Sequence, residues 1–93
     1  MVKTNRFTEK EAREIGAGIG IDWEKSPFKP WEFWVGLHVE LEHGLVSAQT
    51  NVTNDDPVMT GKIALAHLNE FPDYYTRLVK MEEEAEKFWG KED

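Results

Sequence analysis

The residues best suited to chemistry in this chain are two pairs, each made of a glutamate and a histidine. Glu40 and His43 stand three residues apart, and His67 and Glu70 repeat that spacing in the reverse order. Three residues is close to one helical turn, so on a helix each pair shares one face. Because a buried carboxylate or imidazole is costly without a partner, we expect these side chains to be satisfied by a metal ion, by water or by one another.

The Glu-x-x-His spacing is typical of diiron and dimanganese carboxylate bundles, in which facing helices project their ligands inward. Here the second pair is reversed, and further carboxylates would have to come from Glu82 or Glu86. We therefore expect one divalent transition metal, Fe, Mn or Zn, held by two histidines and one or two carboxylates with open positions for water. The candidate metal ligands are Glu40, His43, His67 and Glu70.

Two alternatives stay open for the same four residues. A buried network of imidazole and carboxylate hydrogen bonds would fix the register of the helices without any metal. A metal-free arrangement, in which a carboxylate orients a neutral histidine, could act as a general base. The chain has no cysteine, and no serine or threonine stands in a recognisable nucleophile context. Enzymatic activity is therefore left unassigned, and a non-catalytic protein is favoured.

Three further polar residues, Asp73, Tyr74 and Tyr75, follow the second pair after Phe71 and Pro72. In the structural interpretation, the acid caps a helix and the two rings pack between helices. In the functional interpretation, Asp73 or a tyrosine hydroxyl supports the metal site by holding one tautomer of His67. Arg77 lies one turn after Asp73, so we expect an ion pair of small energetic value.

Helices are the elements predicted to position these residues. Thr8 and Glu11 have the spacing of a capping box at a helix start. Asp56 followed by Pro57 predicts an N-cap and the first residue of another helix, and Phe71-Pro72 predicts a helix break. The expected helices span about 8–15, 31–43, 57–70 and 73–89. Short irregular segments are expected at 16–23 and 45–56. Within them, residues 19–23 and 45–52 are the only places where a short strand could lie. The sequence thus predicts an all-α fold, a bundle of about four helices forming a single domain over residues 1–93.

Apolar spacing predicts which helix faces are buried. The second helix has two apolar stripes, which indicates a central helix or one shared with a partner. On the third helix the predicted inward residues are Met59, Ile63, Ala66, His67 and Glu70. On the fourth helix they are Tyr75, Leu78, Val79, Ala85 and Trp89, and on the second helix His38 is interpreted as packing among aromatic rings.

Composition and charge exclude several classes of protein. Eleven basic residues against eighteen acidic ones give a formal charge of -7, which argues against sequence-independent nucleic-acid binding. The N-terminus has no apolar signal region, and no apolar run approaches the length of a membrane span. We therefore expect a cytoplasmic protein with neither a nucleic-acid nor a membrane partner.

An aromatic cluster offers a second functional hypothesis. Five large rings fall within twelve residues, which is many for the core of a small domain. They are Trp23, Phe28, Trp31, Phe33 and Trp34. We expect part of this cluster, around Trp31 and Trp34, to contact a protein partner or a second copy of the chain. Under this hypothesis the protein is a non-catalytic interaction or structural module, and its His/Glu pairs are a buried hydrogen-bond network.

Three sequence segments carry a resemblance to known proteins. They are Val-Glu-Leu-Glu-His-Gly at 39–44, Asp-Asp-Pro at 55–57, and the run from Thr60 to Leu78 that contains Ala-His-Leu-Asn-Glu-Phe-Pro-Asp-Tyr-Tyr. Together they resemble a small family of prokaryotic and virus-encoded proteins of unknown function. The resemblance implies a compact, mainly helical, stand-alone domain whose signature passes through both His/Glu pairs and on to Tyr75. It implies no mechanism.

Overall fold

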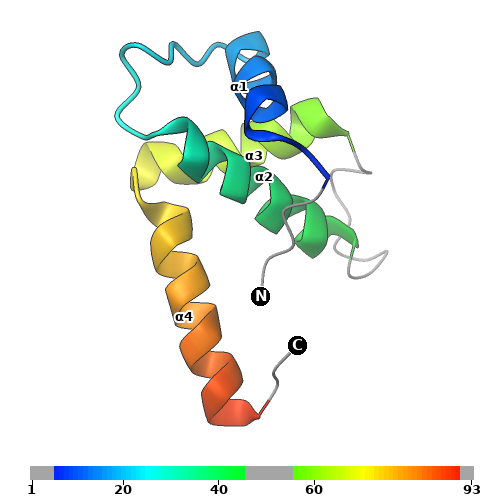
Figure 1. The fold of residues 1–93 in the computed structure, drawn as a ribbon, viewed down its shortest axis with the longest axis vertical. Helices are drawn as coiled ribbons and strands as arrows, with labels where there is room; N and C mark the ends of the chain where they lie inside the picture. Colours follow the sequence, from blue (N-terminus) through cyan, green and yellow to red (C-terminus); the bar gives the residue numbers. More distant parts are fainter. Residues whose placement is uncertain (1–5, 46–55, 91–93) are drawn as a thin grey trace.

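Four helices and the turns between them make up the described part of the chain (Figure 1). The computed structural model describes residues 6–45 and 56–90, with the backbone alone at residues 43–45. In order, the helices are α1 (Glu9–Gly18), α2 (Pro30–Leu45), α3 (Pro57–Glu70) and α4 (Tyr74–Trp89). The prediction of an all-α bundle of about four helices is confirmed.

Local capping signals account for where the helices begin. The Thr8 hydroxyl accepts a hydrogen bond from the Glu11 N–H at 3.1 Å, and the Glu11 carboxylate accepts one from the Thr8 N–H at 2.9 Å. This is the predicted capping box, and it satisfies two of the N–H groups that a helix start leaves unpaired. Asp56 likewise accepts from the Val58 N–H at 2.9 Å, which confirms the predicted start of α3.

The segment expected to be irregular at 16–23 is only partly so. Helix α1 continues to Gly18, beyond the expected end near Ile15, and the chain then turns through Gly20, whose φ of 101° suits glycine. No strand occurs in this segment. Most of the other expected irregular segment, 46–55, lies outside the described residues.

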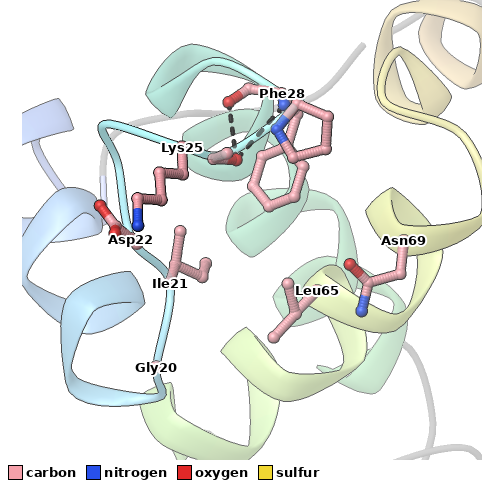
Figure 2. Close-up of a pocket in the computed structure, with 9 residues that line it drawn as sticks. Gly20, Ile21, Asp22, Lys25, Phe28, Leu65 and Asn69 are labelled. Atoms are coloured by element: carbon pink, nitrogen blue, oxygen red, sulfur yellow. Dashed lines mark hydrogen bonds between the residues drawn. The ribbon is translucent and has the colours of Figure 1, made fainter.

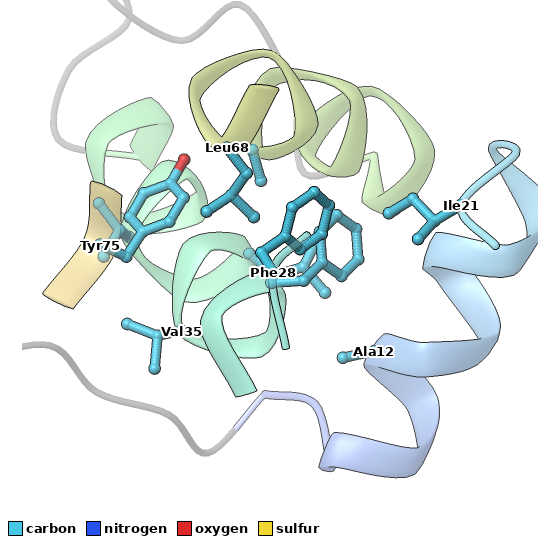
Figure 3. Close-up of a cluster of buried hydrophobic side chains, with 10 residues drawn as sticks. Ala12, Ile21, Phe28, Val35, Leu68 and Tyr75 are labelled. Carbon is cyan, nitrogen blue, oxygen red and sulfur yellow. The ribbon is translucent and has the colours of Figure 1, made fainter. Parts of the chain in front are cut away.

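Helix α2 is the centre of the molecule, as its two apolar stripes predicted. Phe33, Leu37 and Val39 on this helix are fully or almost fully buried, and α1, α3 and α4 all pack against it. Figure 3 shows how the core gathers around α2, with Ala12 and Ile21 contributed from the α1 side, Leu68 from α3 and Tyr75 from α4.

Two α2 side chains also fix the segment that leads into α1. His38 is buried, and its Nε2 accepts a hydrogen bond from the Phe7 N–H at 3.0 Å. Its Nδ1 therefore carries the proton and donates to the Trp34 carbonyl at 2.8 Å. The Trp34 indole N–H in turn donates to the Phe7 carbonyl at 2.7 Å. The prediction that His38 packs among aromatic rings is confirmed, with a backbone anchor added.

Two predicted buried faces are partly wrong. The fully buried residues of α3 are Thr60, Gly61, Ala64 and Leu68. Met59, Ala66 and Glu70, predicted to face inward, are exposed, because the helix packs on the body through the neighbouring face that carries Thr60, Gly61, Ala64 and Leu68. On α4, Ala85 and Trp89 are exposed, because the helix leaves the body of the molecule along its longest axis (Figure 1).

A helix that crosses a membrane needs about 20 consecutive, mostly apolar residues. Within residues 6–45 and 56–90, no helix combines the length and the apolar character needed to cross a bilayer.

Candidate functional site

Glu40 lies where α2, α3 and α4 meet. The Tyr75 hydroxyl donates a hydrogen bond to its Oε2 atom at 2.8 Å. The Nε2 atom of His67 lies 3.6 Å from the same oxygen. The side chain of Glu40 is 12% exposed and that of His67 is 33% exposed, so the cluster opens to solvent on the His67 side. One carboxylate oxygen is thus the common point of three helices.

Tyr74 covers the imidazole of His67. The two rings are stacked, with centroids 4.4 Å apart and an angle of 10° between their planes. Tyr75 meets the His67 ring edge-on at 6.2 Å and the Tyr74 ring at 5.0 Å. Such stacked and edge-on contacts hold aromatic rings in one orientation. The imidazole therefore has a fixed plane although it is partly exposed.

The electrostatics of the cluster keep both tyrosines protonated. Burial raises the pKa of Tyr75 far above its usual range, and the negative charge of Glu40 raises it further. Burial also raises the pKa of Tyr74, with further contributions from the charges of Glu40, Glu70 and Glu82. The Tyr75 hydroxyl is consequently a permanent hydrogen-bond donor to Glu40 near neutral pH.

The start of α4 packs against a row of three residues on α2. Glu32, Gly36 and Glu40 are spaced four apart, so they lie along one face of the helix. A Cβ atom at Gly36 would lie only 2.4 Å from Cε2 of Tyr75, so the ring rests directly on the glycine backbone. At the two ends of the row, the Thr76 hydroxyl donates to Glu32 and the Tyr75 hydroxyl to Glu40. The start of α4 is therefore clamped by two hydrogen bonds around a close ring contact.

The structure brings together some members of the predicted metal site. Glu40 and His67, one from each pair, converge, whereas Glu70 is exposed at the end of α3. His43 lies on α2 one turn after Glu40, and its side chain is outside the described part. Among the side chains that are described, no group of three or more His, Asp or Glu could hold a metal ion.

The residues expected to support the site take separate roles. Asp73 stands at the N-cap position of α4, as the structural interpretation expected, but its side chain makes no capping hydrogen bond. Its Oδ2 instead accepts from Arg77 Nε at 2.8 Å, which confirms the expected ion pair on an exposed surface. The Tyr75 ring stands perpendicular to the His67 ring, while the Tyr75 hydroxyl donates to Glu40. The polar contacts that hold this cluster therefore run through Glu40.

Most side chains of the predicted aromatic surface are buried or half-buried within the fold. Trp34 is half-buried and bonded to Phe7, whereas Trp31 is 46% exposed. A more exposed apolar surface, which the sequence reasoning missed, lies at the far end of α4. There Met81 is 56% exposed, Phe88 78% and Trp89 71%. The sequence does contain a signal for this exposed surface. Met81, Ala85 and Phe88 continue the apolar stripe of α4 beyond the residues that pack against the body.

A pocket of 340 Å³ lies between the α1–α2 loop and α3 (Figure 2). Its apolar wall includes Ile21, Phe28 and Leu65. Two of its polar residues serve the loop itself, because Asp22 accepts from the Glu24 N–H and Ser26 exchanges hydrogen bonds with the Phe28 backbone. The shape of the pocket is thus a consequence of how the α1–α2 loop folds. The described residues that line it do not include a pair of side chains arranged for catalysis.

Comparison with known proteins gives a family. The model of a family described as "Protein of unknown function (DUF5661)" matches residues 12–84, which include all four helices in whole or in large part. No curated protein and no solved structure matches the chain. Since the match covers most of the sequence, the chain belongs to the DUF5661 family of proteins of unknown function.

Proposed function

We propose that this protein is a non-catalytic interaction module in which α1, α2 and α3 form a body that displays α4 as a docking helix. The observation that carries the proposal is the contrast between the two ends of α4. Tyr75 at its start is fully buried, while Phe88 and Trp89 at its end are 78% and 71% exposed. Exposed large apolar groups gathered on one element are characteristic of protein interaction sites.

The polar cluster at the start of α4 supports a structural role for Glu40. Its Oε2 atom already accepts a hydrogen bond from a tyrosine that does not titrate near neutral pH. A general acid or base needs a proton that it can exchange at the working pH. In this proposal Glu40 and Tyr75 set the direction in which α4 leaves the body, and they perform no chemistry.

A pair of variants tests the proposal by thermal unfolding of dilute protein. The double substitution Phe88→Ser and Trp89→Ser should leave the melting temperature within about 2 °C of the wild type, since these rings contribute little to the fold of one chain. Tyr75→Phe should lower the melting temperature clearly, since it removes one of the two hydrogen bonds that clamp the start of α4. A large loss of stability in the double variant would show that the two rings belong to the intramolecular core, and the proposal would fail.

Metal binding is a second candidate, and one distance favours it. Two ligands about 2.1 Å from one tetrahedral ion stand about 3.4 Å apart, and Nε2 of His67 lies 3.6 Å from Oε2 of Glu40. The negative charges of Glu70 and Glu82 lie close enough to affect Tyr74, beside the same imidazole. His43 is the remaining candidate ligand, and Fe, Mn or Zn is the candidate ion.

Elemental analysis of tag-free protein tests this second candidate. A bound metal at close to one equivalent, together with a melting temperature that falls on adding chelator, would support it. The matched variant is His43→Ala with His67→Ala, which removes both imidazoles. If the wild type and this variant carry equally little metal, and chelator shifts neither melting curve, the site is not a metal site.

A further inference from the structure

We infer that the partner of α4 is a second copy of this chain, with the two α4 helices packed antiparallel about a two-fold axis near Met81. The inference rests on the proposed function, which assigns α4 to docking. It adds the identity of the occupant, which is argued from the spacing of apolar residues, the distribution of charge and the location of the exposed rings.

The apolar residues of α4 have the spacing of a helix-pairing seam. Tyr74, Leu78, Met81, Ala85 and Phe88 follow one another at alternating intervals of four and three. This alternation is the repeat that lets two helices pack side by side over their length. The body covers Tyr74 and Leu78 only in part, and it leaves Met81, Ala85 and Phe88 exposed.

The seam is also complementary to itself in the antiparallel direction. A two-fold axis through Met81 places Met81 against its own copy and Phe88 of one chain opposite Tyr74 of the other. The same axis brings Leu78 close to Ala85, a large residue to a small one. A self-complementary patch of this kind is what a two-fold dimer requires.

Charge along α4 favours the antiparallel direction over the parallel one. The first half carries Arg77 and Lys80. The second half carries the acidic residues Glu82, Glu83, Glu84 and Glu86 against one basic residue, Lys87, so it is negative overall. Antiparallel packing sets each basic half against an acidic half, whereas parallel packing sets like charge against like.

One pair of charged residues makes the antiparallel arrangement testable by substitution. Arg77 and Glu84 are two helical turns apart and flank the seam on the same side, so the two-fold axis at Met81 brings Arg77 of each chain to Glu84 of the other. Arg77 bonds to Asp73 through Nε, yet its side chain is 76% exposed. The guanidinium has four further N–H donors, so it can serve both carboxylates.

The exposed aromatic residues next to the seam fit the same axis. Phe71 precedes α4 and Trp89 ends it, and both are exposed. Antiparallel packing brings Trp89 of one chain to Phe71 of the other. Seven large hydrophobic residues are exposed in the described part of the chain, and this one interface takes in Phe71, Met81, Phe88 and Trp89. A 16-residue helix is about 24 Å long, so we expect a small interface and a dimer that forms reversibly with concentration.

Sedimentation velocity of the full chain over a concentration series tests the inference. The wild type should shift from monomer to dimer as its concentration rises. Arg77→Glu and Glu84→Arg should each weaken the dimer about tenfold, because each creates two like-charge contacts per dimer. The double variant, with both substitutions, should recover most of the wild-type affinity. Lys80→Glu and Glu83→Arg make the same charge changes off the seam, so they are the matched controls and should leave the dissociation constant within about twofold.

The outcomes separate this inference from the proposed function. A wild type that is monomeric at every concentration overturns self-pairing, and so does a dimer that the seam and control substitutions affect equally. In either case, unchanged melting of the Phe88→Ser, Trp89→Ser variant would leave α4 as a docking helix for a different protein. Loss of monomer stability in that variant would instead remove the proposed function itself.

Discussion

The hydroxyl of Tyr75 and the carboxylate of Glu40, 35 residues apart in the chain, are joined by a hydrogen bond of 2.8 Å. This bond links the first turn of α4 to the third turn of α2, and the ring behind it rests on Gly36. The direction of α4 therefore depends on a few groups at its start. The exposed end of the helix is positioned by contacts made more than ten residues earlier.

Removing the Tyr75 hydroxyl should cost stability. In Tyr75→Phe the ring contact with Gly36 is kept, but the largely buried Glu40 carboxylate loses its donor, and we expect a loss of about 1–3 kcal/mol. For a domain of this size, that corresponds to a fall in melting temperature of roughly 5–15 °C. The control is Tyr74→Phe, which keeps the stack on His67 and should change the melting temperature by a few degrees at most. Equal effects of the two variants would contradict the assigned role of the Tyr75 hydroxyl.

A methyl group at Gly36 should displace the Tyr75 ring. In Gly36→Ala the new Cβ would stand 2.4 Å from Cε2 of that ring, so either the ring or the helix must move. We expect a net loss of about 1–3 kcal/mol, even though alanine is the better helix former. Gly18→Ala is the matched control, because no atom outside its own helix lies within 4 Å of its added Cβ. Urea unfolding of both variants measures the difference, and an equally stable Gly36→Ala protein would show that the contact is loose.

Stability should fall as the pH drops below about 6.5, the pKa of an unperturbed histidine. Burial lowers the pKa of His38 in the folded protein, and the Phe7 N–H needs Nε2 unprotonated. Above pH 6.5 His38 is neutral in both states and imposes no penalty. Below it the unfolded chain takes up a proton that the folded chain does not, so the free energy of unfolding decreases by up to about 1.4 kcal/mol per pH unit.

Urea unfolding at a series of pH values from 7.5 downward, at constant ionic strength, measures this slope. His38→Gln lacks the titrating group and should show a shallower dependence between about pH 6.5 and 5.5, whatever its absolute stability. Parallel curves for the wild type and the variant would mean that His38 does not carry the effect.

Replacing the buried Thr60 hydroxyl should increase stability. Thr60 is fully buried on α3, and its Oγ1 has no hydrogen-bond partner among the described residues. Thr60→Val keeps the shape of the side chain and removes a polar atom that is costly to bury, so we expect a gain of about 0.5–2 kcal/mol in chemical unfolding. A loss of stability would indicate that the hydroxyl does have a partner.

The sequence predicted the helix starts well because their signals are local. The Thr8 to Glu11 capping box and the Asp56-Pro57 start depend only on residues within one turn of each other. The two apolar stripes of α2 likewise indicated its central position, since a helix buried on several sides needs apolar residues on all of them.

The buried face of α3 could not be predicted from the positions of its large apolar residues. A Cβ at Gly61 would lie 3.3 Å from atoms of Ile15 and Phe33, so α3 approaches its neighbours closely at this glycine. Ala64, one turn later, is fully buried. Met59 looks like a core residue by pattern yet is exposed, because the small residues permit the close contact instead.

The candidate site was predictable in composition but not in geometry. Glu40 and His67 were both identified, but their convergence on one oxygen depends on how α2 and α3 pack. The Tyr75 to Glu40 bond joins residues too far apart in the chain for spacing to reveal it. Trp89 was placed in the core because an apolar stripe does not indicate whether its partner is the same chain or another one.

Hydroxyl-radical footprinting of dilute protein, read by mass spectrometry, tests the central claim most directly, because it reports the exposure of individual side chains. We predict rapid modification of Met81, Phe88 and Trp89 beside slow modification of Tyr75 and Phe33 in the same chain. Slow modification of Phe88 and Trp89 in the monomer, at a rate comparable to that of Tyr75, would show that the end of α4 is packed within its own fold and would contradict the account.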